Sequence, residues 1–247
     1  MKRFGKQSKD SPYCDRFNTE VILTFMEFIM SVYEKIDAMS KRLSQDERRH
    51  ISNRIRLYSE GVKAKIKNAE YALVKIKELS PQSNNITSSD SQDFCVKDKI
   101  HFYVDSFFAF LYSVFDVVSH VTNHKYRLRQ KEKNVSFDKI KKKLNQNHAG
   151  EDIQQIYDGL ARKPFFIQLD KYRNCSTHRR QIFIETLTRS VTPGYTTSGE
   201  ILEVYRLLCD DPLSLNPKTK KGRTLVDYCQ DMMERVKSTV IEISEKI

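Results

Sequence analysis

The sequence predicts an all-α fold, and this prediction rests on its few helix breakers and on its hydrophobic periodicity. The chain has 247 residues, of which only 7 are Gly and 6 are Pro. Residues 82–149 contain neither, so long segments can stay helical without interruption. Apolar residues recur three and four positions apart along most of the chain, which is the spacing of a buried helical face. With 39% hydrophobic residues, the chain can bury a sizeable core.

Residues 1–94 are expected to form an N-terminal hairpin of two long helices, followed by a polar loop. The first helix is predicted over residues 13–39, and the second begins near Ser44, which with Glu47 has the spacing of a capping box. The apolar positions of the second helix have a period close to 3.5 residues, as in helices that pack side by side: Ile51, Ile55, Tyr58, Val62, Ile66, Ala69, Leu73 and Ile76. Pro81 opens a Ser- and Asn-rich stretch that we interpret as the boundary between this hairpin and the rest of the chain.

Residues 95–247 are expected to form a helical bundle on which that hairpin packs. The predicted helices span about residues 96–129, 151–160, 164–189, 199–209 and 224–247, with a further short helix starting near residue 136. The first of these is the most apolar, and its large side chains cover more than half of its circumference: Phe107, Phe108, Phe110, Leu111, Val114, Phe115, Val118 and Val121. Such a helix belongs at the centre of a bundle.

The charge of the chain favours a polyanionic partner, because 43 Lys and Arg against 32 Asp and Glu give a net charge of +11. Nucleic acid is the first candidate and an anionic membrane surface the second, with a basic protein that has neither partner as the alternative. Basic residues concentrate between residues 125 and 150, where two aromatic residues are interleaved with them, a combination that suits RNA. We predict RNA contacts at Arg127, Arg129, Lys139, Lys141, Lys142 and Lys143, with a solvated loop as the alternative.

The cysteines and the N-terminus predict a cytoplasmic protein without a membrane partner. The five cysteines are far apart in the sequence and include no Cys-x-x-Cys pair, which is typical of reduced thiols and not of a disulfide framework. Residues 1–10 are polar and lack the apolar segment of a secretion signal. No run of apolar residues approaches the length of about 18 that a spanning helix needs.

One six-residue run, Arg173-Asn174-Cys175-Ser176-Thr177-His178, concentrates polar residues on one side of a predicted helix. At about 100° per residue, Arg173, Asn174, Thr177 and His178 share one arc, while the apolar residues of the same helix share the other. Arg173 and His178 themselves lie about 140° apart, so a single chain cannot point both at one small target. Two copies facing each other across a two-fold axis can, which predicts a symmetric homodimer.

This run resembles the Arg-x4–6-His signature of the HEPN superfamily, in which the Arg is often followed by Asn, as it is here by Asn174. The resemblance covers about residues 95–247 and implies an all-α bundle, to which residues 1–94 would be an addition. It also implies a metal-independent endoribonuclease, of the kind found in toxins and phage-defence effectors, that acts on RNA and needs no cofactor. An antitoxin or another neutralising protein is then an expected partner.

The resemblance also assigns roles to the residues of the run. Arg173 would hold the phosphate and stabilise its extra negative charge, and His178 would be a general acid or base. Asn174 would orient His178 or the phosphate, and Thr177 is a supporting contact. Two alternatives remain open: a non-catalytic HEPN binding module in a toxin–antitoxin or defence complex, and an unrelated basic helical scaffold.

Asp116 is the acidic residue that we expect to support this site. It lies on the most apolar predicted helix, where a carboxylate needs a partner, and pairing with Arg173 or His178 would fix the geometry of the site. An ordinary structural pair is the alternative. Asp116, His120 and His124 also have the four-residue spacing of metal ligands, but no His-Glu-x-x-His motif and no further ligand accompany them. We therefore predict no metal site.

Overall fold

The computed structural model of the chain describes residues 45–80, 90–147, 150–178, 181–191, 201–209, 211–214, 218 and 223–247. Residues 1–52 and residues 53–247 are two separate units, and apart from the first eight residues of α2 the fold described below belongs to the second. The helix predicted over residues 13–39 and the predicted cap Ser44 lie outside the described residues.

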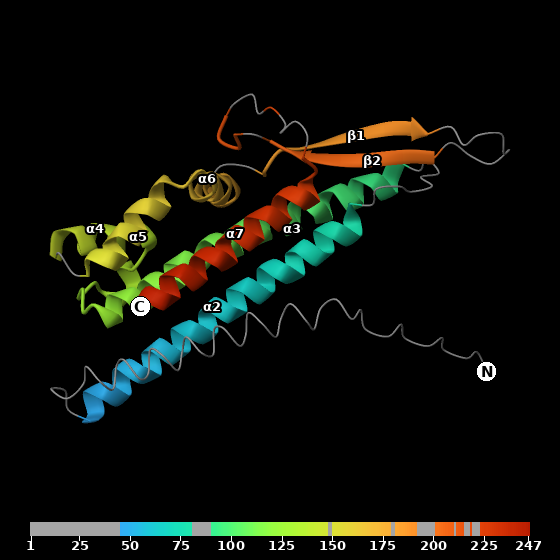
Figure 1. The fold of residues 1–247 in the computed structure, drawn as a ribbon. Helices are drawn as coiled ribbons and strands as arrows, with labels where there is room; N and C mark the ends of the chain where they lie inside the picture. Colours follow the sequence, from blue (N-terminus) through green and yellow to red (C-terminus); the bar gives the residue numbers. More distant parts are fainter. Residues whose placement is uncertain are drawn as a thin grey trace, which may run out of the picture. The chain divides into compact units, whose positions relative to one another are not determined.

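The two longest helices, α2 (Gln45–Leu79) and α3 (Asp90–Lys125), pack in antiparallel directions (Figure 1). Tyr58 of α2 stacks on His120 of α3, and toward the other end Tyr71 meets Tyr103 edge-on. Six buried positions of α2 belong to the predicted apolar period: Ile55, Val62, Ile66, Ala69, Leu73 and Ile76. Ser59 and Ala72 are buried beside them. The predicted second helix is therefore confirmed from residue 45 onward.

Helix α3 is the centre of the bundle, as its composition predicted. Six of its apolar side chains are 0% exposed: Val104, Phe107, Phe108, Leu111, Val114 and Phe115. By length and composition its segment Val96–Lys125 could cross a membrane, but half of the most apolar window in it is buried inside the protein. That burial is typical of the core helix of a soluble bundle.

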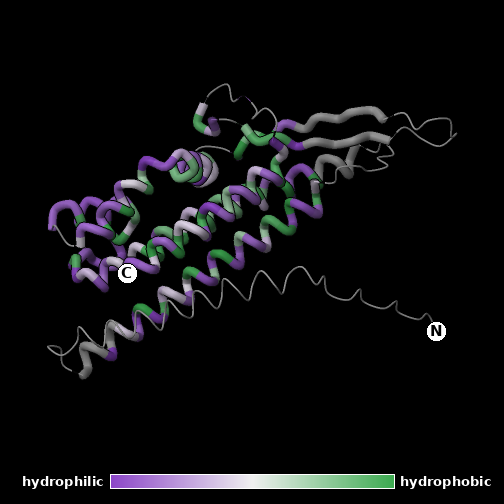
Figure 2. Tube along the Cα trace, in the orientation of Figure 1, coloured by the Kyte–Doolittle hydropathy of each residue, from purple (hydrophilic) through white to green (hydrophobic). Residues whose placement is uncertain are grey.

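Four shorter helices enclose α3: α4 (Phe137–Asn147), α5 (Glu151–Arg162), α6 (Pro164–His178) and α7 (Leu225–Lys246). A 3-10 turn, η2 (Glu132–Asn134), precedes α4. Figure 1 shows α6 nearly end-on, whereas α3 and α7 lie across the view, so α6 crosses α3 steeply. The apolar stretches of α3 and α7 lie among these helices in Figure 2, where the polar residues are purple and the apolar ones green.

Two predicted helices are wrong. The helix predicted over residues 164–189 is wrong in its second half, and the helix predicted over residues 199–209 is wrong over its whole length. Helix α6 ends at His178, and the chain then forms strand β1 (Ile184–Val191). Strand β2 (Ile201–Leu208) pairs with β1 in antiparallel register, from Ile184 opposite Leu208 to Val191 opposite Ile201. Strand β1 is rich in β-branched residues, and β2 contains Ile201, Val204 and Tyr205. Side chains of these types favour a pleated strand over a helix.

The junction between α6 and β1 is attached to α3 through the backbone of Ile182. The Ile182 N–H donates to Asp105, and His101, one turn earlier on α3, also hydrogen-bonds this residue's backbone. Burial raises the pKa of Asp105 to about 6, although the Ile182 N–H acts to lower it. Burial lowers the pKa of His101. Asp105 Oδ1 and His101 Nδ1 are buried without a hydrogen-bond partner among the described residues.

Replacing Asp105 with Asn should change the stability of the fold in a pH-dependent way. The folded pKa of about 6 lies above the unfolded value of about 3.9, so the folded protein holds this proton more tightly. The wild type therefore loses stability as pH rises through the interval between these two values. Asn keeps an acceptor for the Ile182 N–H without a charge, so the variant should gain on the order of 1 kcal/mol relative to wild type across that window, once half-burial is allowed for.

Denaturant unfolding at both ends of that window measures the difference. Glu245→Gln, which changes an exposed carboxyl at the end of α7, is the control and should show no such trend. A stability difference between Asp105→Asn and wild type that stays constant with pH would contradict the assignment.

Candidate active site

The motif helix α6 is anchored by its apolar arc, which faces the core. Leu169, Tyr172 and Cys175 are 0% exposed. The ring of Tyr172 stacks on Phe108 of α3 at 4.3 Å between centroids, and its hydroxyl donates to the carbonyl of Cys209. The Cys175 thiol donates to the carbonyl of Pro212 at 3.1 Å. Cys175, Cys209 and Cys229 are buried and are not joined in disulfides. These contacts fix the rotation of α6 and therefore the direction of its polar arc.

Arg173 lies at the edge of this arc and is held from two sides. Its guanidinium carbon is 4.1 Å from the centre of the Tyr112 ring, a cation–π contact. Its Nη2 is 3.1 Å from Asp170 Oδ1. The side chain is 27% exposed, and its buried Nε–H has no hydrogen-bond partner among the described residues. Arg173 is thus oriented, and the exposed part of its guanidinium stays accessible to a ligand.

Asp170 joins two of the predicted site residues. Its second oxygen, Oδ2, accepts a hydrogen bond of 3.0 Å from the Asn174 amide. The one carboxylate therefore holds both Arg173 and Asn174, which lie three and four residues further along the helix. We did not predict a role for Asp170 from sequence. The spacing was a readable signal, because residues at these offsets are neighbours on a helix surface.

Asp116 lies near Arg173, but its strongest described contact is with α4. Its Oδ1 accepts the backbone N–H of Phe137 at 3.1 Å, at the first turn of that helix. Burial raises the pKa of Asp116, while the Phe137 N–H, then the charge of Arg173, act to lower it. The ion pair that Arg173 forms among the described residues is with Asp170 and not with Asp116. Asp116 thus links the start of α4 to the electrostatic surroundings of Arg173.

The last two residues of the run, Thr177 and His178, are described to different extents. Thr177 is exposed, and its hydroxyl donates to the carbonyl of Arg173 at 2.7 Å, a contact within the helix. The backbone of His178 forms the last residue of α6, and its side chain lies outside what the structure describes. The predicted convergence of Arg173 and His178 therefore stays a prediction.

Two of the histidines of α3, His120 and His124, belong to an aromatic stack. Tyr58 lies 4.6 Å from His120 and 5.7 Å from His124, with 20° between the planes in both cases. The Tyr58 hydroxyl donates to Glu132, which also accepts from Arg54 at 3.4 Å. Among the described residues no three His, Cys, Asp or Glu side chains are grouped to hold a metal ion.

The predicted RNA-binding residues surround the start of α4. That helix buries Phe137, Ile140 and Leu144, which leaves its basic face outward. Lys139 and Lys142 are exposed, as are Arg127 and Arg129 in the loop after α3. Lys141 is 3.7 Å from Asp158 of α5, and Lys143 is half-buried.

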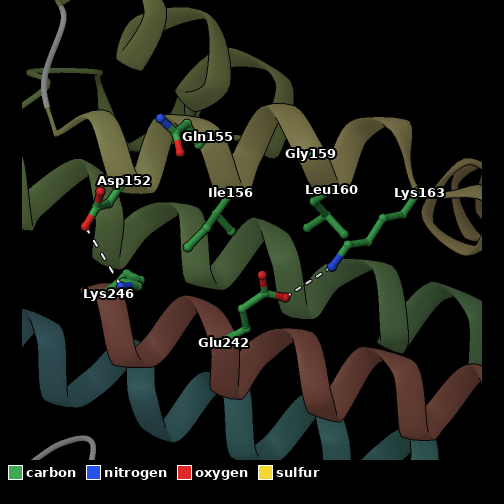
Figure 3. A pocket seen from close by; sticks show the side chains of 8 residues that line it. All are labelled: Asp152, Gln155, Ile156, Gly159, Leu160, Lys163, Glu242 and Lys246. Carbon is green, nitrogen blue, oxygen red and sulfur yellow. Dashed lines mark hydrogen bonds and ion pairs between the residues drawn. The ribbon is translucent and has the colours of Figure 1, made fainter.

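A cavity of about 320 Å³ lies between α5 and α7, away from these residues (Figure 3). Two ion pairs cross it, Lys163 to Glu242 at 3.1 Å and Lys246 to Asp152 at 3.9 Å. Between these pairs, Ile156 and Leu160 extend from α5 toward α7 (Figure 3), and the described lining includes none of the predicted site residues.

The geometry around Arg173 suits the recognition of an anion, because a fixed guanidinium with an available donor matches a phosphate oxygen. A comparison with family models matches residues 58–211 to the HEPN_Cthe2314-like HEPN family, which is more than half of the chain. The match includes α3, α6 and the complete Arg173–His178 run. No curated protein and no solved structure matched the chain. Because the family model matches more than half of a helical bundle that carries the motif on α6, the chain belongs to the HEPN superfamily, in the HEPN_Cthe2314-like family.

Proposed function

We propose that this protein is a metal-independent endoribonuclease of the HEPN type that acts as a toxin or a phage-defence effector. The observation that carries the proposal is that Arg173, in a chain of this family, is held in a fixed orientation. Arg173 opens an Arg-Asn-x3-His run, is fixed by Tyr112 and Asp170, and has a side chain that is 27% exposed. A donor held in this way is prepared for a phosphate, because its orientation costs nothing at the moment of binding.

In the proposed reaction the RNA supplies its own nucleophile. The 2′-hydroxyl attacks the adjacent phosphorus, its proton goes to a general base, and the 5′-oxygen leaves with a proton from a general acid. His178 takes one of these two proton transfers, because the unperturbed pKa of an imidazole lies near neutrality. The products are a 2′,3′-cyclic phosphate and a free 5′-hydroxyl. DNA lacks the 2′-hydroxyl and is not cleaved.

Arg173 stabilises the additional negative charge of the pentavalent phosphorus, and Asn174 orients the phosphate or His178. Asp170 and Tyr112 position Arg173 and do not touch the RNA. The ion pair with Asp170 partly neutralises the guanidinium charge. Arg173 therefore stabilises the phosphate most when its guanidinium leaves Asp170 and binds the RNA instead.

A symmetric homodimer completes the site in this proposal. Arg173 and His178 are five residues apart on one helix, α6, which separates their directions by about 140°. Two copies of α6 at a two-fold axis bring the Arg173 of one protomer to the His178 of its partner. The cationic residues after α3 and on α4 then attract the RNA backbone.

The ion pair of Arg173 with Asp170 favours a second candidate, a non-catalytic HEPN module that binds a protein partner in a toxin–antitoxin or defence complex. An arginine that is neutralised within its own helix can serve packing alone. Thr177 points to the same reading, because its hydroxyl is engaged with the backbone of its own helix. The first experiment below separates the two candidates.

Arg173→Ala and His178→Ala should each lower RNA cleavage by a factor of about 100 or more, in buffer with excess EDTA. Wild type should give products ending in a 2′,3′-cyclic phosphate and leave DNA of the same sequence intact. Arg162→Ala, which removes an exposed arginine in the last turn of α5, is the matched control and should cut at the wild-type rate. Variants that cut as fast as wild type would sink the proposal, and loss of wild-type cleavage in EDTA would exclude the metal-independent mechanism.

Mixing the two inactive variants should restore activity if the site is shared between protomers. A heterodimer of Arg173→Ala and His178→Ala has one site with both wild-type residues and one site with neither. Free exchange of protomers then gives about a quarter of wild-type activity, since half of the dimers carry one of two intact sites. A mixture that stays inactive, although light scattering shows a dimer that exchanges its protomers, would contradict the composite site.

Neutralising Lys141, Lys142 and Lys143 together to Gln should weaken RNA binding and flatten its dependence on salt. Each lost phosphate contact should reduce the slope of log affinity against log salt by about 0.7 for a single strand. A filter-binding titration over several salt concentrations measures both quantities. Unchanged affinity and slope would mean that this segment is a solvated face.

A further inference from the structure

The turn after α3 contains two arginines in a backbone conformation that side chains rarely adopt. Arg127 has φ of 49° and Arg129 has φ of 57°, and within the described residues they are the two non-glycine residues with positive φ. Glycine is the usual residue at such a position after a helix, because a Cβ is disfavoured there. Both arginine side chains are nevertheless exposed, so packing does not explain why they replace glycine.

Other residues of the turn specify its shape. The N–H of Leu128 donates to the carbonyl of Asn123 at 3.0 Å, and the N–H of Arg127 donates to that of His124 at 3.3 Å. This pair of bonds is the Schellman arrangement, with the left-handed residue at Arg127. Leu128 is 2% exposed. The side chain of Asn123 accepts from the Gln130 N–H and donates to the Gln130 carbonyl, both at 3.0 Å. Leu128 and Asn123 therefore hold the turn, and the two arginine side chains are not needed for its shape.

The charges of this turn are not neutralised by the protein. Arg127, Arg129, Lys131 and Lys133 are exposed and form no ion pair with a described carboxylate. The one acidic residue among them, Glu132, is engaged by Tyr58 and Arg54 of α2. Burying Leu128 between the two arginines keeps both guanidinium groups on the solvent side of the same short turn. Such a local concentration of arginine donors suits phosphate oxygens.

We propose that Arg127 and Arg129 form a phosphodiester-binding clip for the RNA strand, retained at the expense of backbone strain. Strained non-glycine residues persist where function requires their side chains. The inference rests on the proposed function, since RNA is the ligand. The clip acts on binding and not on the chemical step, because α3 extends thirteen residues, or about 20 Å, from Tyr112 beside Arg173 to Lys125 at the start of the turn.

The test replaces both arginines with glycine and measures affinity and stability together. The probe is a fluorescent 2′-O-methyl RNA strand, which lacks the nucleophile and reports binding without cleavage. Arg127→Gly with Arg129→Gly should bind it several-fold more weakly, with the salt slope reduced by about 1.4 for two lost contacts on a single strand. The same variant should melt a few degrees higher than wild type, because glycine relieves the left-handed strain.

Two controls separate a clip from bulk charge and from a distorted turn. Arg127→Lys with Arg129→Lys keeps the charge on the same backbone and should retain most of the affinity. Lys131→Gln with Lys133→Gln removes the same number of charges from the same turn at residues without positive φ, and should reduce the affinity less. An equal loss in this lysine variant would overturn the clip, as would unchanged binding in the glycine variant or a wild type that does not bind the probe.

The test of the clip can succeed or fail independently of the proposed nuclease activity. Intact probe binding that needs the two arginines, without any RNA cleavage by wild type, supports the clip and removes the proposed enzyme. Cleavage that needs Arg173 and His178, with probe binding unchanged in the glycine variant, supports the enzyme and removes the clip. In an active protein the glycine variant should raise KM and leave kcat unchanged.

Discussion

The enclosure of α3 is the constraint on which the rest of the structure depends. This helix carries apolar side chains on most of its circumference, and six of them are completely excluded from solvent. A helix of this kind is stable in water only when neighbours cover every apolar side, since each buried Phe or Leu contributes roughly 1.5–3 kcal/mol. Helices α2, α4, α5, α6 and α7 supply that cover. The polar residues of α3, among them Tyr112 and Asp116, are therefore confined to the narrow gaps between those helices, where they meet Arg173 and the start of α4.

Most of the helical part of the fold could be read from the sequence, and the reason is its periodicity. Most buried residues of α2 and of the central part of α3 are ones that the spacing selected, although Ser59, Ala72 and Val104 were not among them and Phe110 is only half-buried. Helix α5 begins where its predicted range begins, and α7 begins one residue later than predicted. The hairpin could not be read in the same way. Residues 182–189 can be drawn as an apolar helical arc, but Ile184, Thr186 and Thr188 are β-branched and alternate along the chain. The pairing of β1 with β2 decides between the two patterns, and that pairing is a non-local contact that a local pattern does not contain.

In the candidate site, too, local features could be predicted from the sequence and contacts between helices could not. Arg173 and Asn174 were predicted from the motif, and the structure brings both to one carboxylate. Asp170 was missed because the motif begins three residues after it, although helical spacing alone makes it a neighbour. The contact of Tyr112 with Arg173 was not predictable, because it depends on how α6 crosses α3, which sequence periodicity does not give. The role of Asp116 was predicted as a partner of the motif, whereas its amide contact is with the first residue of α4.

The buried thiols give this protein an internal probe of its own motion. Cys175 lies on the motif helix between Asn174 and the polar residues that follow, and Cys229 lies on α7, and both are 0% exposed. Burial also raises the pKa of the Cys229 thiol, which suppresses its reactive thiolate. Such a thiol reacts with an alkylating reagent only when its surroundings open. The alkylation rates of Cys175 and Cys229 therefore report the opening of α6 and of α7 separately. Equal rates would mean that the motif helix opens only when the core does, and a faster rate at Cys175 would mean that it opens alone.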